Sequence, residues 1–199
     1  MQKTQRLAET KLPTTYGEYT MHAYDSGKED FPHIVLVQGI EKDKVVNVRI
    51  HSECMTGDVF SSVRCDCGEQ LDASMHHFHE NGGVLIYLRQ EGRGIGLINK
   101  MKAYNLQDEG LDTIKANHAL GFHTDERNFT DAIEILKDLG IASINLLTNN
   151  PEKLDAFKDS GIEVNERIAI EIRARKENKD YLETKRSGMG HFIKGLDLR

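Results

Sequence analysis

Three cysteines are the residues of this 199-residue chain with the most specific chemistry. Cys54, Cys65 and Cys67 lie in RIHSECMTGDVFSSVRCDCGEQL, where one thiol precedes a close pair. A single intervening residue is poor geometry for a disulfide between Cys65 and Cys67, so the spacing indicates thiolate chemistry or metal binding. Three sulfur ligands favour a tetrahedral zinc that keeps its fourth position for water, as catalytic sites do. We expect Gly57 and Gly68 to give the backbone freedom to bring the thiols together.

The spacing of these cysteines leaves other interpretations open. A histidine would complete a closed structural site, the candidates being His51, His76, His77 and His79. Three unrelated buried thiols would bind no metal. The fragment His51-Ser52-Glu53 matches half of the zinc deaminase signature, whereas the Pro-Cys-x-x-Cys half is missing.

A glycine loop is the second segment with binding potential. In LRQEGRGIGLINK, Arg89 and Arg93 flank a loop that leads into a predicted helix, whose N-terminus favours anions. The loop lacks the Gly-Lys-Ser/Thr ending of a P-loop, and Gly92, Gly94 and Gly96 do not form a dinucleotide-binding fingerprint. Alone, the loop is weak evidence for an anion site.

The segments around these residues predict strands that alternate with helices. The opening is β-rich, with extended segments at 12–24, 33–39 and 45–51, and a helix capped by Gly82 follows the cysteines. GVLIYL is typical of a strand buried on both faces, and it precedes the glycine loop and a helix. The positions at helical spacing in that helix are Ile95, Ile98, Lys102 and Leu106.

A second unit of this kind follows towards the C-terminus. It comprises a helix in FTDAIEILKDLGI, a strand in SINLLTNN, and a helix that begins at Pro151 after the cap Asn150. We therefore predict a mixed α/β (α+β) fold, in which a β-rich N-terminal part precedes alternating strands and helices with a partly parallel sheet. We expect one domain over residues 1–199, with a disordered tail at 193–199.

Charge and hydrophobicity argue against nucleic acids and membranes as partners of this protein. The formal charge of −6 argues against a nucleic-acid polymer, since attraction to its phosphates needs a basic surface. No apolar run approaches the roughly 18 residues of a membrane span, and the start MQKTQRLAETK lacks the apolar core of a signal peptide. We expect a cytoplasmic protein with no membrane partner.

Several motifs together resemble one enzyme family. RIHSECMTGD, RCDCG and LRQEGRGIGLINK are similar, in this order, to signatures of GTP cyclohydrolase II, and ANHALGFHTDERNF and LLTNNPEK continue the likeness over residues 11–192. The resemblance implies zinc-dependent hydrolysis of GTP to 2,5-diamino-6-(5-phospho-ribosylamino)pyrimidin-4(3H)-one, formate and pyrophosphate, the first step of riboflavin biosynthesis. Met55 and Ser61 depart from residues frequent in the family, but neither does chemistry.

The resemblance also implies residue roles. Cys54, Cys65 and Cys67 would bind one zinc ion, and Tyr104 would assist it. Asp125 would act as base for pyrophosphate release. Arg127 is a nucleophile in descriptions of the family, but the pKa of a guanidinium, above about 12, favours a charge clamp. The implied GTP contacts are Arg49, Ile50, His51, Ser52, Glu53, Gln70, Glu91, Gly92, Arg93, Thr113, Thr148 and Lys153.

Further expectations concern the ligands and the assembly. Glu91 would accept hydrogen bonds from guanine, Mg²⁺ would bridge the triphosphate, and the family suggests a homodimer. Without the resemblance, Tyr104 would be a core aromatic, Asp125 to Arg127 a charged turn, and Lys153 part of a solvated helix. Two rival functions are a zinc deaminase, which would release ammonia instead of formate, and a non-catalytic zinc module with a closed site.

Overall fold

The computed structural model describes residues 4–27, 31–41, 43–196 and 198. The chain divides into two compact units, each built from segments distant in sequence. The first unit comprises Met1–His51, Asp72–Arg89 and Asn128–Ile170, and the second comprises Ser52–Leu71, Gln90–Arg127 and Glu171–Arg199. That these form a single domain over residues 1–199 stays a prediction.

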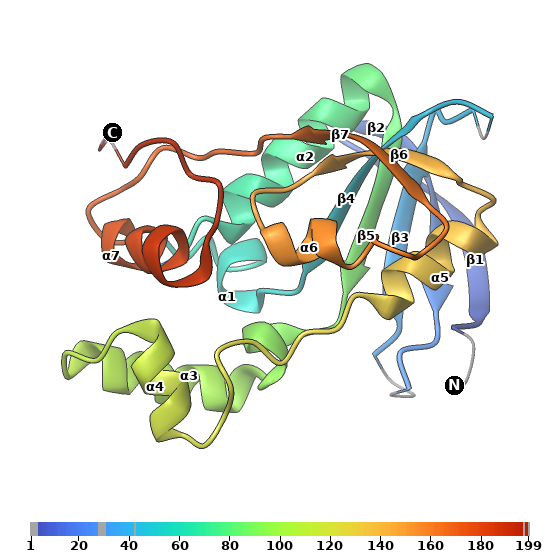
Figure 1. Cartoon of the computed structure of the whole chain (residues 1–199). Coiled ribbons are helices and arrows are strands. Elements are labelled where there is room, and N and C mark those ends of the chain that lie inside the picture. The colour runs from blue at the N-terminus through green and yellow to red at the C-terminus, as the bar shows by residue number, and fades with distance from the viewer. Residues whose placement is uncertain (1–3, 28–30, 42, 197, 199) are drawn as a thin grey trace. The chain divides into compact units, whose positions relative to one another are not determined.

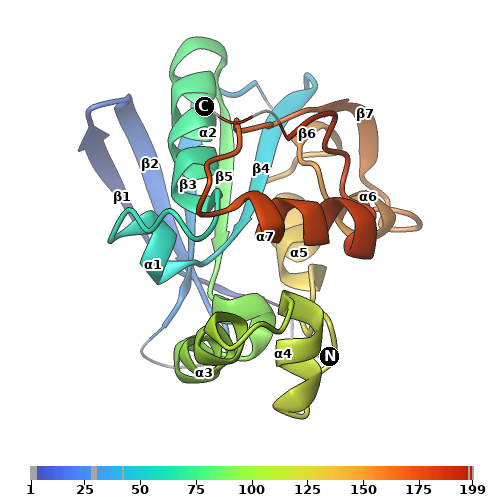
Figure 2. The ribbon, with the colours of Figure 1, turned by 90° about the vertical axis from the view of Figure 1, so that its left-hand side faces the viewer.

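A mixed sheet is the framework of the first unit (Figure 1). Its strands are β1 (Arg6–Thr14), β2 (Gly17–Tyr24), β3 (His33–Gln38), β4 (Val46–Ser52), β5 (Gly83–Leu88), β6 (Ser143–Leu147) and β7 (Glu163–Ile168). The order is β1-β2-β3-β5-β4-β6-β7, with β1 and β7 at opposite edges (Figure 2). Pairs β1–β2, β2–β3 and β3–β5 are antiparallel, whereas β4–β6 and β6–β7 are parallel. The predicted β-rich opening and partly parallel sheet are confirmed.

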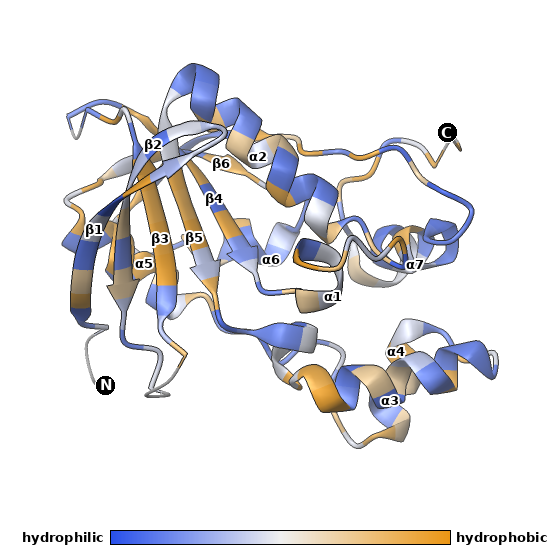
Figure 3. Cartoon of the chain, turned by 180° about the vertical axis from the view of Figure 1, so that it is seen from behind, coloured by the Kyte–Doolittle hydropathy of each residue, from blue (hydrophilic) through white to orange (hydrophobic). Residues whose placement is uncertain are grey.

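The central strands of the sheet consist largely of hydrophobic residues (Figure 3), and many of these belong to the buried core. Val84, Leu85 and Ile86 of β5 are all buried, and because neighbouring residues of a strand point to opposite faces, both faces of β5 are covered, as expected. Helix α5 (Thr130–Asp138) covers one face of the sheet, and residues 72–81 of α2 (Cys67–Asn81) cover the other (Figures 1 and 3). Ile135 of α5 and Phe78 of α2 are fully buried. Each such buried side chain stabilises the fold by about 2 kcal/mol.

The predicted helix boundaries follow their capping residues. Helix α2 ends before Gly82, whose φ of +67° is the left-handed cap expected from the sequence. Helix α6 (Pro151–Asp155) begins after Asn150, whose side chain accepts a hydrogen bond from the Glu152 N–H at 3.0 Å. Both caps are confirmed.

Short helices make up the second unit. They are α1 (Met55–Asp58), the first turn of α2, the 3₁₀ helix η1 (Glu91–Gly94), α3 (Leu97–Asp108), α4 (Thr113–Ala119), α7 (Lys179–Glu183) and the π-helix η2 (Thr184–Gly188). The predicted helix after the glycine loop is confirmed as α3. Of the residues named at helical spacing, Ile95 is buried and Ile98 is exposed, and the buried residues of α3 itself are Lys100 and Ala103.

Some elements carry little sequence signal. Strand β7 is a half-exposed edge strand with the mostly polar sequence EVNERI, and α4 has only the cap Asp112 to mark its start. Residues 197 and 199 of the predicted tail lie outside the described residues, while Leu198 forms a parallel bridge with Ala174. None of the helices in the described part of the chain has the length and apolarity that a membrane crossing requires.

Candidate active site

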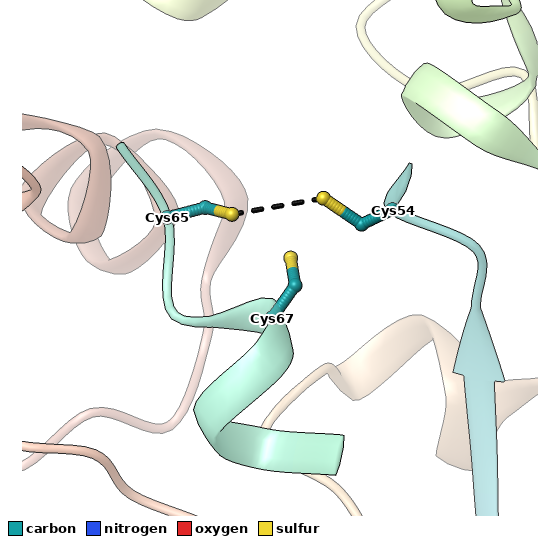
Figure 4. A group of neighbouring side chains, drawn as sticks. All are labelled: Cys54, Cys65 and Cys67. Atoms are coloured by element: carbon teal, nitrogen blue, oxygen red, sulfur yellow. Dashed lines mark hydrogen bonds between the residues drawn. The ribbon is translucent and has the colours of Figure 1, made fainter. Parts of the chain in front are cut away.

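Three cysteine sulfurs converge in the second unit (Figure 4). Cys54 lies between β4 and α1, Cys65 in the loop before α2, and Cys67 at the first position of α2. All three Sγ atoms lie within 4.8 Å of one another, and those of Cys54 and Cys65 are 3.7 Å apart. A tetrahedral zinc with Zn–S bonds of about 2.3 Å needs sulfurs roughly 3.8 Å apart, so the cluster fits this ion.

Two glycines allow this convergence, although for a different reason from the one predicted. Neither has a left-handed backbone; a Cβ would have no room at Gly68 and would be crowded at Gly57. A Cβ on Gly68 would lie 2.3 Å from the carbonyl oxygen of Gly57, and one on Gly57 would lie 3.2 Å from Sγ of Cys65. Close approach of two backbone segments therefore requires glycine at position 68.

The charge of the thiol cluster is concentrated on Cys54. Hydrogen bonds from Cys65 and Cys67, with the positive charge of Lys100, hold the pKa of Cys54 far below its ordinary value. The hydrogen bond with Cys54 raises the pKa of Cys65 to about 11, and the pKa of Cys67 is raised for the same reason. The cluster thus offers an anionic sulfur and two hydrogen-bonded thiols, a donor set suited to a soft cation.

Lys100 is a site residue that sequence reasoning missed. Its Nζ donates to Cys54 Sγ at 3.1 Å and to Glu91 Oε1 at 2.8 Å, and the side chain is buried. The signal for it was a lysine in the first turn of the helix after the glycine loop. Glu91 also accepts hydrogen bonds from the backbone N–H groups of Met55 and Gly92, both at 2.6 Å.

The glycine loop has an unusual backbone. Gly92 and Arg93 both have positive φ, +63° and +59°, which is rare for a non-glycine residue and occurs often at functional sites. The carbonyl of Arg93 accepts a hydrogen bond from the N–H of Glu126 at 3.0 Å, so this loop contacts the Asp125 segment. Arg93 NH1 is buried and has no hydrogen-bond partner among the described residues, which suits binding of an anion.

Asp125 and Arg127 form a bidentate ion pair. Nε and NH2 of Arg127 donate to the Asp125 carboxylate at 2.5–3.1 Å, and NH1 donates to Ser52 Oγ at 3.4 Å. Burial raises the pKa of Asp125, but the hydrogen bond and charge of Arg127, with a contribution from Arg93, outweigh it, so the net pKa is lowered. Both groups are therefore charged at neutral pH.

Tyr104 lies in the same unit with its hydroxyl near the cluster. The hydroxyl is 3.5 Å from Thr56 Oγ1, which is itself 3.6 Å from Cys54 Sγ. Burial raises the pKa of Tyr104, so the phenol stays protonated and can donate a hydrogen bond. Arg64 stacks on its ring, 4.9 Å from the centroid. This position is not that of an aromatic packed into the hydrophobic core.

The other predicted contacts of the second unit are more dispersed. Gln70 is buried and donates to Asp66 Oδ2 at 2.5 Å, and Asp66 accepts from Lys185 Nζ at 2.7 Å. Thr113 is the first residue of α4, and Glu53 is half-buried. Lys185, which sequence reasoning also missed, thus ties the C-terminal segment to the residue between two of the cysteines.

The remaining predicted contacts, which gather near the ends of two strands of the first unit, are Arg49, Ile50, His51, Thr148 and Lys153. Strands β4 and β6 run parallel, and in α/β sheets the carboxyl ends of such strands bind ligands. Lys153 Nζ donates to the Ile50 carbonyl at 2.6 Å, and Arg49 NH1 donates to the Leu147 carbonyl at 3.0 Å. Lys153 is only 4% exposed, so the alternative of a solvated helix is wrong.

Comparison with known proteins decides the family. The family model described as GTP cyclohydrolase II matches residues 5–169, most of the chain. The chain belongs to the GTP cyclohydrolase II family. It is 51% identical over 195 residues to GTP cyclohydrolase-2 of Histophilus somni, covering 97% of this chain and 90% of that protein. It is 50% identical over 191 residues to GTP cyclohydrolase-2 of Hamiltonella defensa, covering 95% and 97%.

A third relative of the GTP cyclohydrolase II family is longer. The riboflavin biosynthesis protein RibBA of Chlorobium phaeovibrioides is 50% identical over 191 residues, which are 95% of this chain and 47% of that protein. The chain therefore spans about half the length of this curated relative and most of the length of the two others. The resemblance inferred from the sequence motifs is confirmed.

Proposed function

We propose that this protein hydrolyses GTP to 2,5-diamino-6-(5-phospho-ribosylamino)pyrimidin-4(3H)-one, formate and pyrophosphate, the first step of riboflavin biosynthesis. The observation that carries the proposal is the cluster of Cys54, Cys65 and Cys67 in a chain of the GTP cyclohydrolase II family. These thiolates would hold one zinc ion. When bound, zinc supplies a water of lowered pKa, about 7, and a Lewis acid for a carbonyl oxygen.

Tyr104 contributes a protonated hydroxyl to ring opening. Its raised pKa keeps the phenol a hydrogen-bond donor at neutral pH, and its distance of 3.5 Å from Thr56 Oγ1 aims it towards the cysteine cluster. We assign it to donate to the oxygen that develops charge as the imidazole ring opens and formate leaves. A Tyr104→Phe enzyme would then accumulate the ring-opened formamide.

Arg127 acts as a charge clamp in the release of pyrophosphate. Its guanidinium is paired with Asp125 through two nitrogen atoms, which supports a charged arginine over a neutral nucleophile. Asp125, with its lowered pKa, orients Arg127 and is a weak base. Mg²⁺ would bridge the phosphate oxygens alongside these cations.

In this proposal Glu91 recognises guanine. The other implied contacts in each unit also bind GTP. The carboxylate already accepts three internal donors, two on Oε1 and one on Oε2. A carboxylate has about four acceptor positions, so one site on Oε2 is available to a guanine N–H. Unchanged relative efficiency for GTP and ITP in Glu91→Gln would contradict this assignment.

We further propose a homodimer that acts in the cytoplasm. Large apolar side chains of the second unit are exposed, which supports burial against a second copy: Val59, Phe60, Ile98 and Met101. A reducing compartment suits three free cysteines. Light scattering on the purified protein tests the dimer.

The deciding experiment is an assay of purified protein with GTP and Mg²⁺, before and after zinc removal. The proposal predicts formate and pyrophosphate in equal amounts, loss of formate on chelation, and its recovery with added zinc. Release of ammonia in place of formate would identify a deaminase. A zinc-bound protein that releases neither product would be a binding module.

A further inference from the structure

Lys100 is a buried lysine that contacts the thiol cluster directly. It lies in the first turn of α3, and its Nζ is 3.1 Å from Sγ of Cys54. The side chain is 11% exposed, so the ammonium has exchanged most of its water for protein partners. A buried ammonium is retained only where anions or strong acceptors surround it, and here they are the thiolate and one carboxylate.

Glu91 holds the ammonium in position. Its Oε1 accepts from Lys100 Nζ at 2.8 Å, and the carboxylate is itself fixed by the N–H groups of Met55 and Gly92. Because two backbone donors fix the carboxylate, the ammonium is directed towards Cys54 with little freedom to turn away. Lys100 Nζ also lies 5.7 Å from the ring centroid of Tyr104.

The charges explain what such a lysine would do. Zinc with three thiolates carries a formal charge of −1, and this excess of electron density makes the ion a weaker Lewis acid than zinc with three imidazoles. A hydrogen bond to a ligand sulfur withdraws electron density from the metal, and outer-shell partners of this kind orient the ligand and tune the ion. An ammonium donates a charge-assisted hydrogen bond, which is about twice as strong as one between neutral groups.

We infer that Lys100 is a positioning residue of the metal centre, whose ammonium, oriented by Glu91, hydrogen-bonds the Cys54 thiolate, strengthens metal binding and raises the Lewis acidity of the ion. The inference rests on the proposed function, since it requires the three cysteines to hold a metal. It assigns a role to a residue outside the contacts and ligands that the family resemblance implies.

The test compares metal binding by four proteins: wild type, Lys100→Met, Lys100→Arg and the control Lys102→Met. Lys102 lies on the same helix and is exposed. We expect Lys100→Met to bind zinc about tenfold to a hundredfold more weakly in competition with a chromophoric chelator. Lys100→Arg should restore most of the affinity, and Lys102→Met should match the wild type.

A spectroscopic signature separates tuning from a structural role. In cobalt-substituted protein, loss of the hydrogen bond leaves the Cys54 sulfur more electron-rich, so the thiolate-to-cobalt charge-transfer band of Lys100→Met should move to lower energy. Lys100→Arg should keep the wild-type band. If Lys100→Met does not fold, Lys100→Gln takes its place with the same expected direction and a smaller change.

The outcomes distinguish the inference from the proposed function. Wild-type protein that binds neither zinc nor cobalt would contradict the proposed function. Wild-type protein that binds metal, with unchanged affinity and an unchanged band in the folded Lys100 variant, would overturn only the inference. A weakened affinity with an unchanged band would also overturn it, because it would reduce Lys100 to a packing role.

Discussion

Arg127 and Asp125 form a bidentate ion pair in which the guanidinium Nε and NH2 donate to the two carboxylate oxygens. Each side chain is nearly buried, 13% and 14% exposed, so the pair is screened little by water. A bidentate pair fixes the guanidinium plane, and its remaining nitrogen NH1 reaches Ser52. This orientation makes Arg127 a rigid cation.

Replacing Arg127 by lysine tests whether charge or nucleophilicity matters. A charge clamp predicts that Arg127→Lys retains pyrophosphate release at a rate reduced by about tenfold to a hundredfold, because lysine keeps the charge but loses the planar fork. The measurement is pyrophosphate release at saturating GTP, with exposed Arg186→Lys as the matched control. A guanylyl group trapped on Arg127 by rapid quench would contradict the clamp.

The lowered pKa of Asp125 predicts an acid-dependent loss of stability. The folded state favours the ionised form of this carboxylate. Its contribution to the free energy of unfolding is therefore present above the unfolded pKa of about 4 and is lost as the pH falls through the lower folded pKa. Urea unfolding should show that the stability advantage of wild type over Asp125→Asn at pH 7 shrinks below about pH 4. An advantage that stays constant down to pH 3 would refute this reading of the ion pair.

Lys153 should contribute to GTP binding through its buried ammonium. A charged hydrogen bond of about 1.5–3 kcal/mol predicts that Lys153→Met lowers kcat/KM by about tenfold to a hundredfold. Steady-state kinetics at fixed Mg²⁺ measure this, and Lys158→Met, whose side chain is 74% exposed, is the control. Equal kinetics for the two variants would remove Lys153 from the proposed contacts.

Gly68 should be far less replaceable than Gly57. A Cβ at Gly68 would lie 2.3 Å from a carbonyl oxygen, whereas the nearest atoms to one at Gly57 are 3.2 Å away. Gly68→Ala should cost about 2–3 kcal/mol of unfolding free energy and lower the zinc content, since the two backbone segments must separate. Metal analysis and urea unfolding of Gly68→Ala and Gly57→Ala check this. A larger loss of stability and zinc in Gly57→Ala would contradict the importance of the contact between Gly68 and the Gly57 carbonyl.

The buried pair of Lys185 and Asp66 should connect the C-terminal segment to the cysteine loop. Its Nζ–Oδ1 distance is 2.7 Å, and both side chains are buried. Lys185→Met removes the ammonium that compensates the buried charge of the Asp66 carboxylate, which should cost about 3–5 kcal/mol, while exposed Lys179→Met should cost little. In a double-mutant cycle with Asp66→Asn, the costs should be clearly less than additive. Additive costs would mean that the two residues do not interact.

Local patterns were enough to predict much of the fold. The apolar run of β5, the cap Asn150 and the left-handed Gly82 each act within a few residues, so the sequence reveals them directly. The helical spacing of Ile98 did not reveal which side of α3 is buried, because tertiary contacts expose Ile98 and bury Lys100. Strand β7 and the π-helix η2 were missed because neither has an apolar period of its own.

By itself, the sequence determined the residue types and their order: three cysteines, a glycine loop and an Asp-Glu-Arg segment in the arrangement of one enzyme family. Only the tertiary structure decided which charged side chains contact one another. Contacts such as Lys100 with Cys54 and Lys185 with Asp66 join residues 46 and 119 positions apart. A buried charge is stable only beside its partner, and that partner is chosen by the packing of distant segments, not by neighbouring residues.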